Sequence, residues 1–117
     1  MYKKYNKYSN HKTIMNGETF DSRLEGRRWQ VLQYLLRAGE IHDLERQKAY
    51  ELQPAYTIAG RKVRPIIYVA DFVYTDKNGK LHVEDVKGYR TDVYTIKKKM
   101  FEYRTGIQIT EITKEDM

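Results

Sequence analysis

Residues 66–88 have the sequence IIYVADFVYTDKNGKLHVEDVKG, and this stretch decides the fold. Its first part, Ile66 to Tyr74, is rich in β-branched and aromatic residues, which is typical of a buried strand. Turn-forming residues follow at 76–79, and Leu81 to Val86 can form a second strand. We therefore predict a central antiparallel β-hairpin.

The length of the hairpin turn determines whether Asp71 and Asp85 face the same side of the sheet. A two-residue Asn-Gly turn would place the two carboxylates on opposite sides. A three-residue turn pairs Asp76 with Lys80 and sets Asp71 opposite Asp85, with their β-carbons about 5 Å apart. Aspartate at the first position and Gly79 in the left-handed position favour the longer turn. We therefore predict that the two acids lie together.

Two helices are expected, one on each side of this hairpin in the sequence. The first begins at Ser22, a good N-cap residue, runs to about Ala38 and stops at Gly39. The second is capped by Thr91 or Asp92 and ends at Gly106. Apolar residues at helical spacing in the second helix are expected to be buried: Val93, Ile96, Met100 and Tyr103.

Further strands complete the expected fold. Residues 41–58 have an irregular strand-like pattern interrupted at Pro54, residues 107–112 alternate, and Asn16-Gly17 is a strong hairpin signal. The order is helix-strand-strand-strand-helix-strand, which indicates an α/β (α+β) protein with a mixed β-sheet flanked by helices. We predict one domain over 13–117, preceded by a flexible basic N-terminal tail over 1–12.

Composition limits the class of protein. The 117 residues fit one domain, 40% of them are hydrophobic and 32% are charged, as in a globular protein. The absence of cysteine excludes disulfides and thiolate metal sites. The longest apolar run is too short to cross a bilayer, so we expect a soluble, cytoplasmic protein. The net charge of +6 suits a polyanionic partner such as nucleic acid.

Glu25 is a candidate functional residue on the first helix. It shares a side of that helix with Trp29, Leu32 and Leu36, so its carboxylate is expected to point toward the core. A second interpretation is a capping box, in which Ser22 and Glu25 only satisfy backbone N–H groups at the helix start. The sequence leaves both interpretations open.

Asp71, Asp85 and Lys87 are candidates on the two strands. Regular alternation would put Asp71 among aliphatic neighbours, where a carboxylate needs a cation, hydrogen-bond donors or a proton. Asp85 and Lys87, two residues apart, would share the facing side. Together with Glu25, the acids could hold Mg²⁺, which activates water for phosphodiester hydrolysis, while the lysine stabilises developing negative charge.

Three short blocks carry a family resemblance. Residues 20–25 (FDSRLE), 70–72 (ADF) and 83–88 (VEDVKG) resemble, in order and spacing, the three motifs of PD-(D/E)XK nucleases. They look most like the phage endonuclease I branch, which resolves Holliday junctions, and like a family of small uncharacterised phage proteins. The resemblance extends over residues 13–113. Ala70 stands at the position of the name-giving proline, and Glu84 neighbours the acid of the third motif.

The resemblance implies a restriction-endonuclease-like sheet and a metal-dependent DNA endonuclease, active in the host cytoplasm if phage-encoded. Glu25, Asp71 and Asp85 would be the metal ligands for Mg²⁺, which Mn²⁺ could replace, and Lys87 the catalytic lysine, with no organic cofactor. Branched DNA is the expected substrate, and two symmetric cuts imply a homodimer. The alternatives are a nicking or restriction-like endonuclease on duplex DNA and a non-catalytic basic DNA-binding module.

Basic residues outside the catalytic set are candidates for phosphate contact. An equally plain interpretation of each is a charged residue on a solvated surface. They lie on the first helix, in the loop beyond Gly60 and on the second helix: Arg27, Arg28, Arg61, Lys62, Arg64, Lys97 and Lys98.

Overall fold

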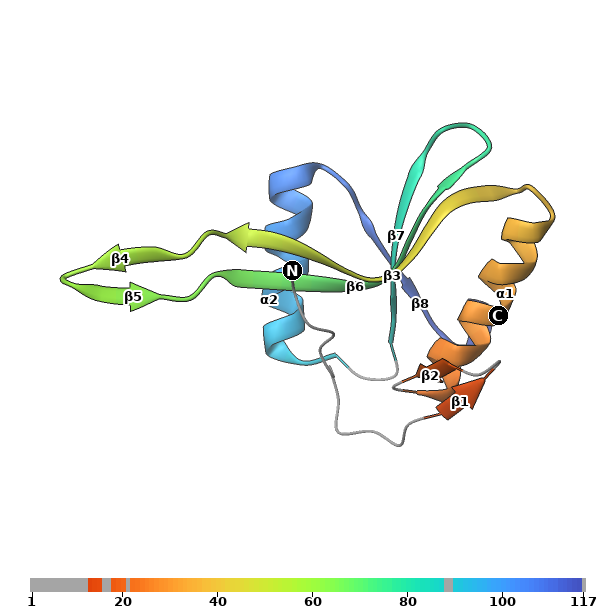
Figure 1. Ribbon diagram of the computed structural model, residues 1–117, viewed down its shortest axis with the longest axis horizontal. Coiled ribbons are helices and arrows are strands. Elements are labelled where there is room, and N and C mark those ends of the chain that lie inside the picture. Colours follow the sequence, from red (N-terminus) through yellow and green to blue (C-terminus); the bar gives the residue numbers. More distant parts are fainter. Residues whose placement is uncertain (1–12, 16–17, 21, 88–89, 117) are drawn as a thin grey trace.

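The protein is a mixed α+β fold, seen in a computed structural model that describes residues 13–15, 18–20, 22–87 and 90–116. Two helices flank a four-stranded mixed sheet (Figure 1). Along the chain the elements are β1 (Thr13–Met15), β2 (Glu18–Phe20), α1 (Arg23–Arg37), β3 (Ile41–Gln53), β4 (Tyr56–Ile58), β5 (Arg61–Val63), β6 (Ile66–Asp76), β7 (Leu81–Val86), α2 (Asp92–Thr105), β8 (Ile109–Ile112) and the short 3-10 helix η1 (Lys114–Asp116).

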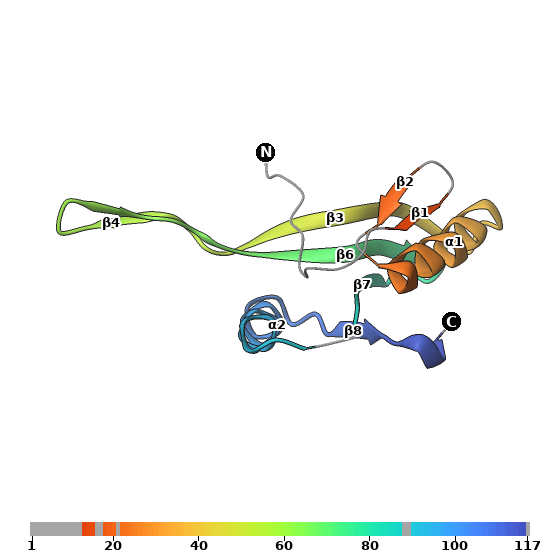
Figure 2. The same cartoon turned by 90° about the horizontal axis from the view of Figure 1, so that it is seen from below.

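The main sheet has the strand order β3-β6-β7-β8. Strands β3, β6 and β7 pair antiparallel, whereas β8 joins β7 in parallel after the crossover through α2. One apolar cluster joins this sheet to α1 through Trp29 and Leu32, and a second joins it to α2 through Tyr94 and Phe101. The predicted fold class and element order are therefore confirmed, with the helices at opposite ends of the sheet (Figures 1 and 2).

Local signals placed several boundaries correctly. Ser22 caps α1 by accepting the Glu25 N–H at 3.1 Å, and Gly39 has a positive φ of 75° just beyond the helix. Strand β3 ends before Pro54, as the sequence indicated. Strands β1 and β2 pair as the predicted hairpin, whereas its turn at 16–17, the N-terminal tail and Gly88 lie outside the described residues. Among the described helices, none is long and apolar enough to span a membrane.

The β6–β7 turn is the longer of the two alternatives. The Asp76 N–H donates to the Lys80 carbonyl at 2.9 Å, the Gly79 N–H returns to the Asp76 carbonyl, and Gly79 has a φ of 81°. Phe72 pairs with Glu84 and Thr75 with Leu81, which is the register that the longer turn predicts. The turn and this register are therefore confirmed. The ladder pairs end at Phe72↔Glu84, one position before Asp71 and Asp85, so the meeting of these two carboxylates stays a prediction.

The Asp76 carboxylate holds this turn together. Its Oδ1 accepts the N–H groups of Asn78 (2.8 Å) and Lys80 (3.0 Å), and its Oδ2 meets His82 Nε2 at 2.8 Å. The hydrogen bond to His82, followed by those to the backbone, holds the pKa of Asp76 below its usual 3.8. The ionised form of Asp76 is thus more stable in the folded chain than in the unfolded chain.

We expect Asp76→Ala to lower the melting temperature at pH 7 and to lower it less in acid. Because the folded-state pKa is depressed, the carboxylate contributes stability above pH 3.8 and loses it as the pH falls through the lower, folded-state value. Thermal melts of both proteins between pH 7 and pH 2.5 would measure the difference. A difference that stays constant over this range would contradict the assignment.

The expected regular alternation of β6 is wrong at Asp71. Tyr68 and Ala70 pack toward α2, but beyond Asp71 it is Val73 that does so, while Phe72 packs toward α1. On the neighbouring strand β3, the pairs Arg46↔Phe72 and Lys48↔Ala70 place Gln47 opposite Asp71, and Gln47 has a positive φ of 52°. A left-handed residue in a strand changes the direction in which the neighbouring side chains point. Beyond this point, side chains of β3 and β6 that would have pointed to one face of the sheet therefore point to the other.

The apolar stripe predicted to bury α2 is mostly exposed, so this prediction is wrong. Val93, Ile96 and Tyr103 are between 58% and 92% exposed, and only Met100 packs partly against the core. The buried residues are Tyr94 and Phe101. Helix α2 is turned toward them because the Tyr94 ring lies beneath Lys87 and its hydroxyl donates to Glu111.

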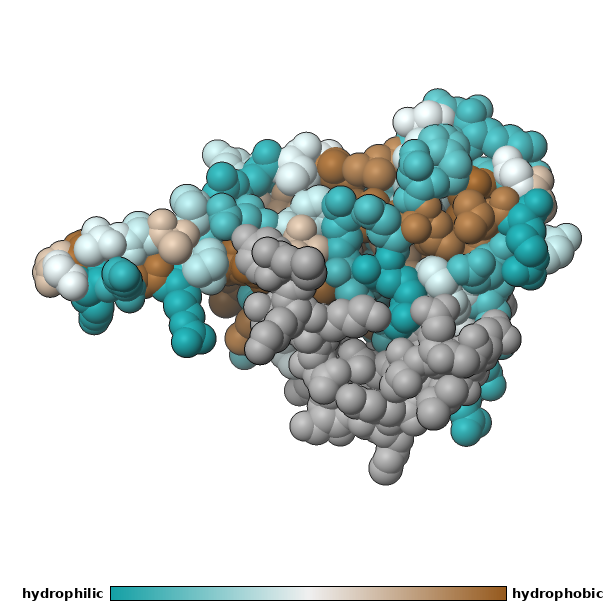
Figure 3. All heavy atoms as spheres, in the orientation of Figure 1, coloured by the Kyte–Doolittle hydropathy of each residue, from teal (hydrophilic) through white to brown (hydrophobic). Residues whose placement is uncertain are grey.

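Strands β4 and β5 form a two-stranded arm that projects from the body (Figures 1 and 2). All of β4 and most of β5 are exposed. Ala59 and Gly60 connect the strands with φ angles of 50° and 75°, as in a tight turn that matches strand twist. Figure 3 shows hydrophilic and hydrophobic residues side by side on the arm.

Candidate active site

Glu25 enters the site from the first turn of α1. Gly26, Trp29 and Leu32 are the other buried residues of this helix, so Glu25 lies on its inward side as expected. Its side chain is only 4% exposed, and its Oε1 accepts a hydrogen bond from the Gln47 amide at 3.0 Å. Ser22 caps the helix as in a capping box, but the Glu25 carboxylate is held against the sheet.

Asp71 lies where β6 exchanges faces. Its Oδ1 accepts from the same Gln47 amide at 3.3 Å, and its Oδ2 accepts the backbone N–H of Val86 at 2.7 Å. The Val86 N–H thus donates to the Asp71 side chain, beyond the last backbone pair of β6 and β7, Phe72↔Glu84. The Asp71 carboxylate thus contacts both neighbouring strands, through Gln47 on β3 and through the Val86 N–H on β7.

Asp85 and Lys87 come from the end of β7. The Lys87 ammonium lies 2.6 Å from Asp85 Oδ1 and 3.6 Å from the centre of the Tyr94 ring. Tyr68 donates to Asp85 Oδ2 at 2.7 Å. Burial, and then the charge of Asp85, raise the pKa of the Tyr68 hydroxyl. Tyr68 therefore remains a protonated donor at every physiological pH.

All four residues expected to form the site are buried, with exposures of at most 5%. Burying three carboxylates together is unfavourable unless cations or donors compensate their charge. Lys87, Tyr68, Gln47 and the Val86 N–H supply part of that compensation. The fold thus joins Glu25 and Asp71 through Gln47 and pairs Asp85 with Lys87.

The residues fit a hard divalent cation by donor type, since carboxylate and amide oxygens are the ligands that Mg²⁺ and Mn²⁺ take. In the side-chain arrangement described, no group of three or more His, Cys, Asp or Glu residues among the described residues is close enough to hold a metal ion. The Gln47 amide lies between two of the acids. Binding a cation through all three acids would therefore require their side chains to rearrange.

Glu84 has different contacts from its neighbour Asp85. It is paired with the guanidinium of Arg28 through two hydrogen bonds of 2.8 and 2.6 Å, and Tyr74 donates to the same carboxylate. Burial and the bond to Glu84 raise the pKa of Tyr74, and the hydrogen bond to Glu84 raises that of Arg28. Glu84 therefore faces α1, which agrees with the assignment of the ligand position to Asp85.

The predicted DNA-contacting residues differ in how accessible they are. Arg27 is exposed on α1, whereas the Arg28 side chain is 13% exposed and bound to Glu84. On α2, Lys98 pairs with Glu102 at 3.3 Å and Lys97 is half-buried. The three basic residues of the arm are exposed: Arg61, Lys62 and Arg64.

Two residues of the site had escaped sequence reasoning. Gln47 lies in the irregular part of β3, and no local pattern marks it. Tyr68 has the appearance of a core residue, and its ring does pack against Phe101, but its hydroxyl is bonded to Asp85. The hydroxyl of Tyr68, which needs a hydrogen-bond partner at a buried position, was the one signal available for this residue.

Fold and site together define a small mixed α+β protein with a buried cluster of acids beside a lysine. The chain matches the family model described as "Protein of unknown function (DUF1064)" over residues 5–115. It therefore belongs to that family. Comparison with curated proteins gives no significant match. Comparison with solved structures gives none either.

Proposed function

We propose that the protein is a Mg²⁺-dependent DNA endonuclease of the PD-(D/E)XK type that hydrolyses phosphodiester bonds in branched DNA. The observation that carries the proposal is the burial of Glu25, Asp71 and Asp85 beside Lys87, from three elements in the order of the nuclease motifs. A basic protein with such a cluster suits a polyanionic substrate and a cation that offsets the acids.

Each residue has a role in this proposal. Glu25, Asp71 and Asp85 would hold Mg²⁺, which supplies charge neutralisation and a nucleophilic water when bound. Lys87 is held by Asp85 and stacked on Tyr94, so its ammonium is fixed next to the Asp85 carboxylate. There it would stabilise negative charge on the phosphate. Tyr68 positions Asp85 from the opposite side of the carboxylate.

The arm is the surface we assign to DNA. Residues 52–70 contain Arg61, Lys62 and Arg64 but neither aspartate nor glutamate. A two-stranded ribbon also has the dimensions that a major groove admits. Arg27 is exposed on the same helix as Glu25 and is kept as a contact near the cut. Arg28 is left out because Glu84 occupies its guanidinium.

Two symmetric cuts in a junction need two active sites, so the proposal includes a homodimer. We place the interface on the exposed residues Val93, Ile96 and Tyr103 of α2. Together with Met100 they follow the alternating spacing of three and four residues that lets one helix pack along another. A second copy on this stripe would bury apolar surface that the single chain leaves in water.

A cleavage panel tests the function directly. We expect the purified protein with Mg²⁺ or Mn²⁺ to cut a synthetic four-way junction faster than a flap, and a flap faster than linear duplex of the same sequence, with no cutting in EDTA. Equal cutting of duplex and junction would favour the nicking or restriction-like alternative. Binding without cutting in either metal would favour the non-catalytic DNA-binding module.

A further inference from the structure

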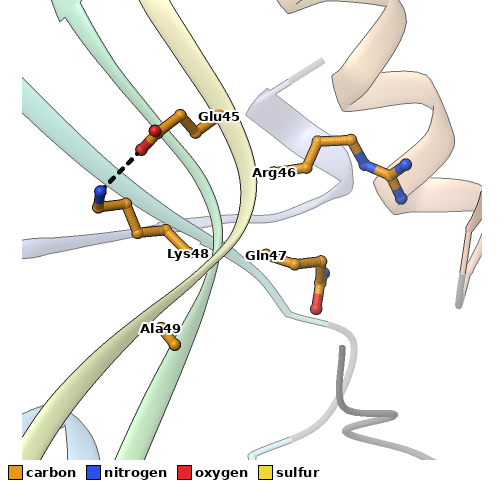
Figure 4. A pocket seen from close by; sticks show the side chains of 5 residues that line it. All are labelled: Glu45, Arg46, Gln47, Lys48 and Ala49. Atoms are coloured by element: carbon orange, nitrogen blue, oxygen red, sulfur yellow. Dashed lines mark ion pairs between the residues drawn. The ribbon is translucent and has the colours of Figure 1, made fainter. Parts of the chain in front are cut away.

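Gln47 has a backbone conformation that is not required to form strand β3. It lies on β3 opposite Asp71, and its φ of 52° puts a non-glycine residue in the left-handed region. That conformation costs about 1–2 kcal/mol. Its effect is visible in Figure 4, where Arg46 and Gln47 project to the same side of β3 while Glu45 and Lys48 project to the other. The backbone is thus arranged to bring the Gln47 side chain to the acids.

The amide nitrogen of Gln47 connects two carboxylates. It donates to Glu25 Oε1 at 3.0 Å and to Asp71 Oδ1 at 3.3 Å. These residues come from α1 and β6, so the one side chain ties the helix to the sheet at the candidate active site. The Gln47 amide N–H groups are positively polarised and lie between two carboxylates. A cation would be most favourable at the same place.

The amide oxygen of Gln47 is used differently from the nitrogen. Oε1 is buried and accepts no hydrogen bond from the residues that the structure describes. A buried acceptor left in this way costs about 1–3 kcal/mol. The residue also lines an open hollow of about 490 Å³ along β3 (Figure 4).

We propose that Gln47 is a fourth ligand of the divalent cation, supplying Oε1 alongside the carboxylates of Glu25 and Asp71. Rotation about the last bond of the side chain, a soft torsion, exchanges the nitrogen between the acids for the oxygen. The same amide therefore screens the two acids from each other without the cation and coordinates the cation when it binds. This inference rests on the proposed function, because it assumes the cation that the nuclease proposal requires.

Mn²⁺ binding to the full chain tests the inference, measured by isothermal titration calorimetry at pH 7. Gln47→Leu removes the oxygen, so we expect affinity to fall on the order of 10- to 100-fold. Gln47→Glu replaces it with a charged oxygen, so we expect Mn²⁺ to bind at least as tightly as to the natural chain and to raise the melting temperature more. Gln53→Leu, another glutamine of β3, is the matched control and should bind as the natural chain does.

The Leu variant distinguishes a metal ligand from a residue that only joins the helix to the sheet. If Gln47 only donated hydrogen bonds, Gln47→Leu would remove the donor between Glu25 and Asp71 and leave their charges for a cation to offset, so Mn²⁺ would bind as tightly as to the natural chain or more tightly. That outcome, or a Gln47→Glu variant that binds Mn²⁺ more weakly than the natural chain, overturns the inference alone. A natural chain that binds no Mn²⁺ overturns both the inference and the proposed function.

Discussion

Lys87→Met is expected to abolish detectable Mg²⁺-dependent cleavage of a four-way junction, with a loss on the order of 10²- to 10³-fold or more. Lys87 follows the end of β7, and its ammonium lies 2.6 Å from Asp85 Oδ1. Methionine keeps the apolar stem over the Tyr94 ring but removes the ammonium. The substitution should therefore affect the reaction more than the fold.

Lys80→Met is the matched control for this substitution. Lys80 is an exposed lysine in the turn of the same hairpin, so its loss should leave the cleavage rate within a factor of about two, as for surface substitutions in general. Single-turnover rates, junction affinity by gel shift and thermal melts should be measured for both variants. Loss of binding in parallel with cleavage in Lys87→Met would show that the lysine maintains the fold or the DNA surface.

Glu84→Ala is expected to destabilise the fold strongly. It leaves the half-buried Arg28 guanidinium and the Tyr74 hydroxyl without the carboxylate that both contact. Removing one member of a buried ion pair costs about 3–5 kcal/mol, and the lower end applies because Arg28 keeps some solvent contact. The melting temperature should fall on the order of 10 °C or more.

Arg27→Ala is the control for Glu84→Ala, because Arg27 is the exposed neighbour of Arg28 on α1. Its stability should change by less than about 0.5 kcal/mol. Chemical denaturation of both variants would give the two free energies of unfolding. A loss below about 1 kcal/mol for Glu84→Ala would mean that the carboxylate is free for another role, which would reopen the choice between Glu84 and Asp85 as ligand.

Features that depend on neighbouring residues could be predicted from the sequence. Asp76 and Gly79 determine the type of the β6–β7 turn, and the turn sets the register of the hairpin as far as the pair Phe72↔Glu84. Ser22 likewise located the start of α1 and hence the inward direction of Glu25. Local signals thus predicted the fold class and the elements on which the four candidate residues lie.

Features that depend on distant residues could not be predicted in the same way. Arg28 was expected to be available to DNA, but its partner Glu84 is 56 positions away in the chain. The buried side of α2 is determined by Tyr94, which contacts Lys87 and Glu111 on other elements. Apolar spacing alone therefore identified a stripe of α2 that faces water.

The exchange of faces at Gln47 and Asp71 is the most important of these unexpected features. Alternation along a strand assumes an extended conformation at each residue, and the left-handed backbone of Gln47 breaks that assumption. The consequence is favourable for the proposed site, because Asp71 reaches Gln47 on β3 and Val86 on β7 at once. A flat strand would have confined it to one aliphatic face.

The proposal that a divalent cation binds where Glu25, Asp71 and Asp85 meet is tested most directly by a crystal structure of the protein grown with Mn²⁺. An anomalous difference map should show one or more Mn²⁺ peaks in contact with carboxylate oxygens of these three residues, about 2.0–2.4 Å away. A well-ordered site with no anomalous peak at saturating Mn²⁺, or peaks only at other surfaces, would contradict the nuclease account.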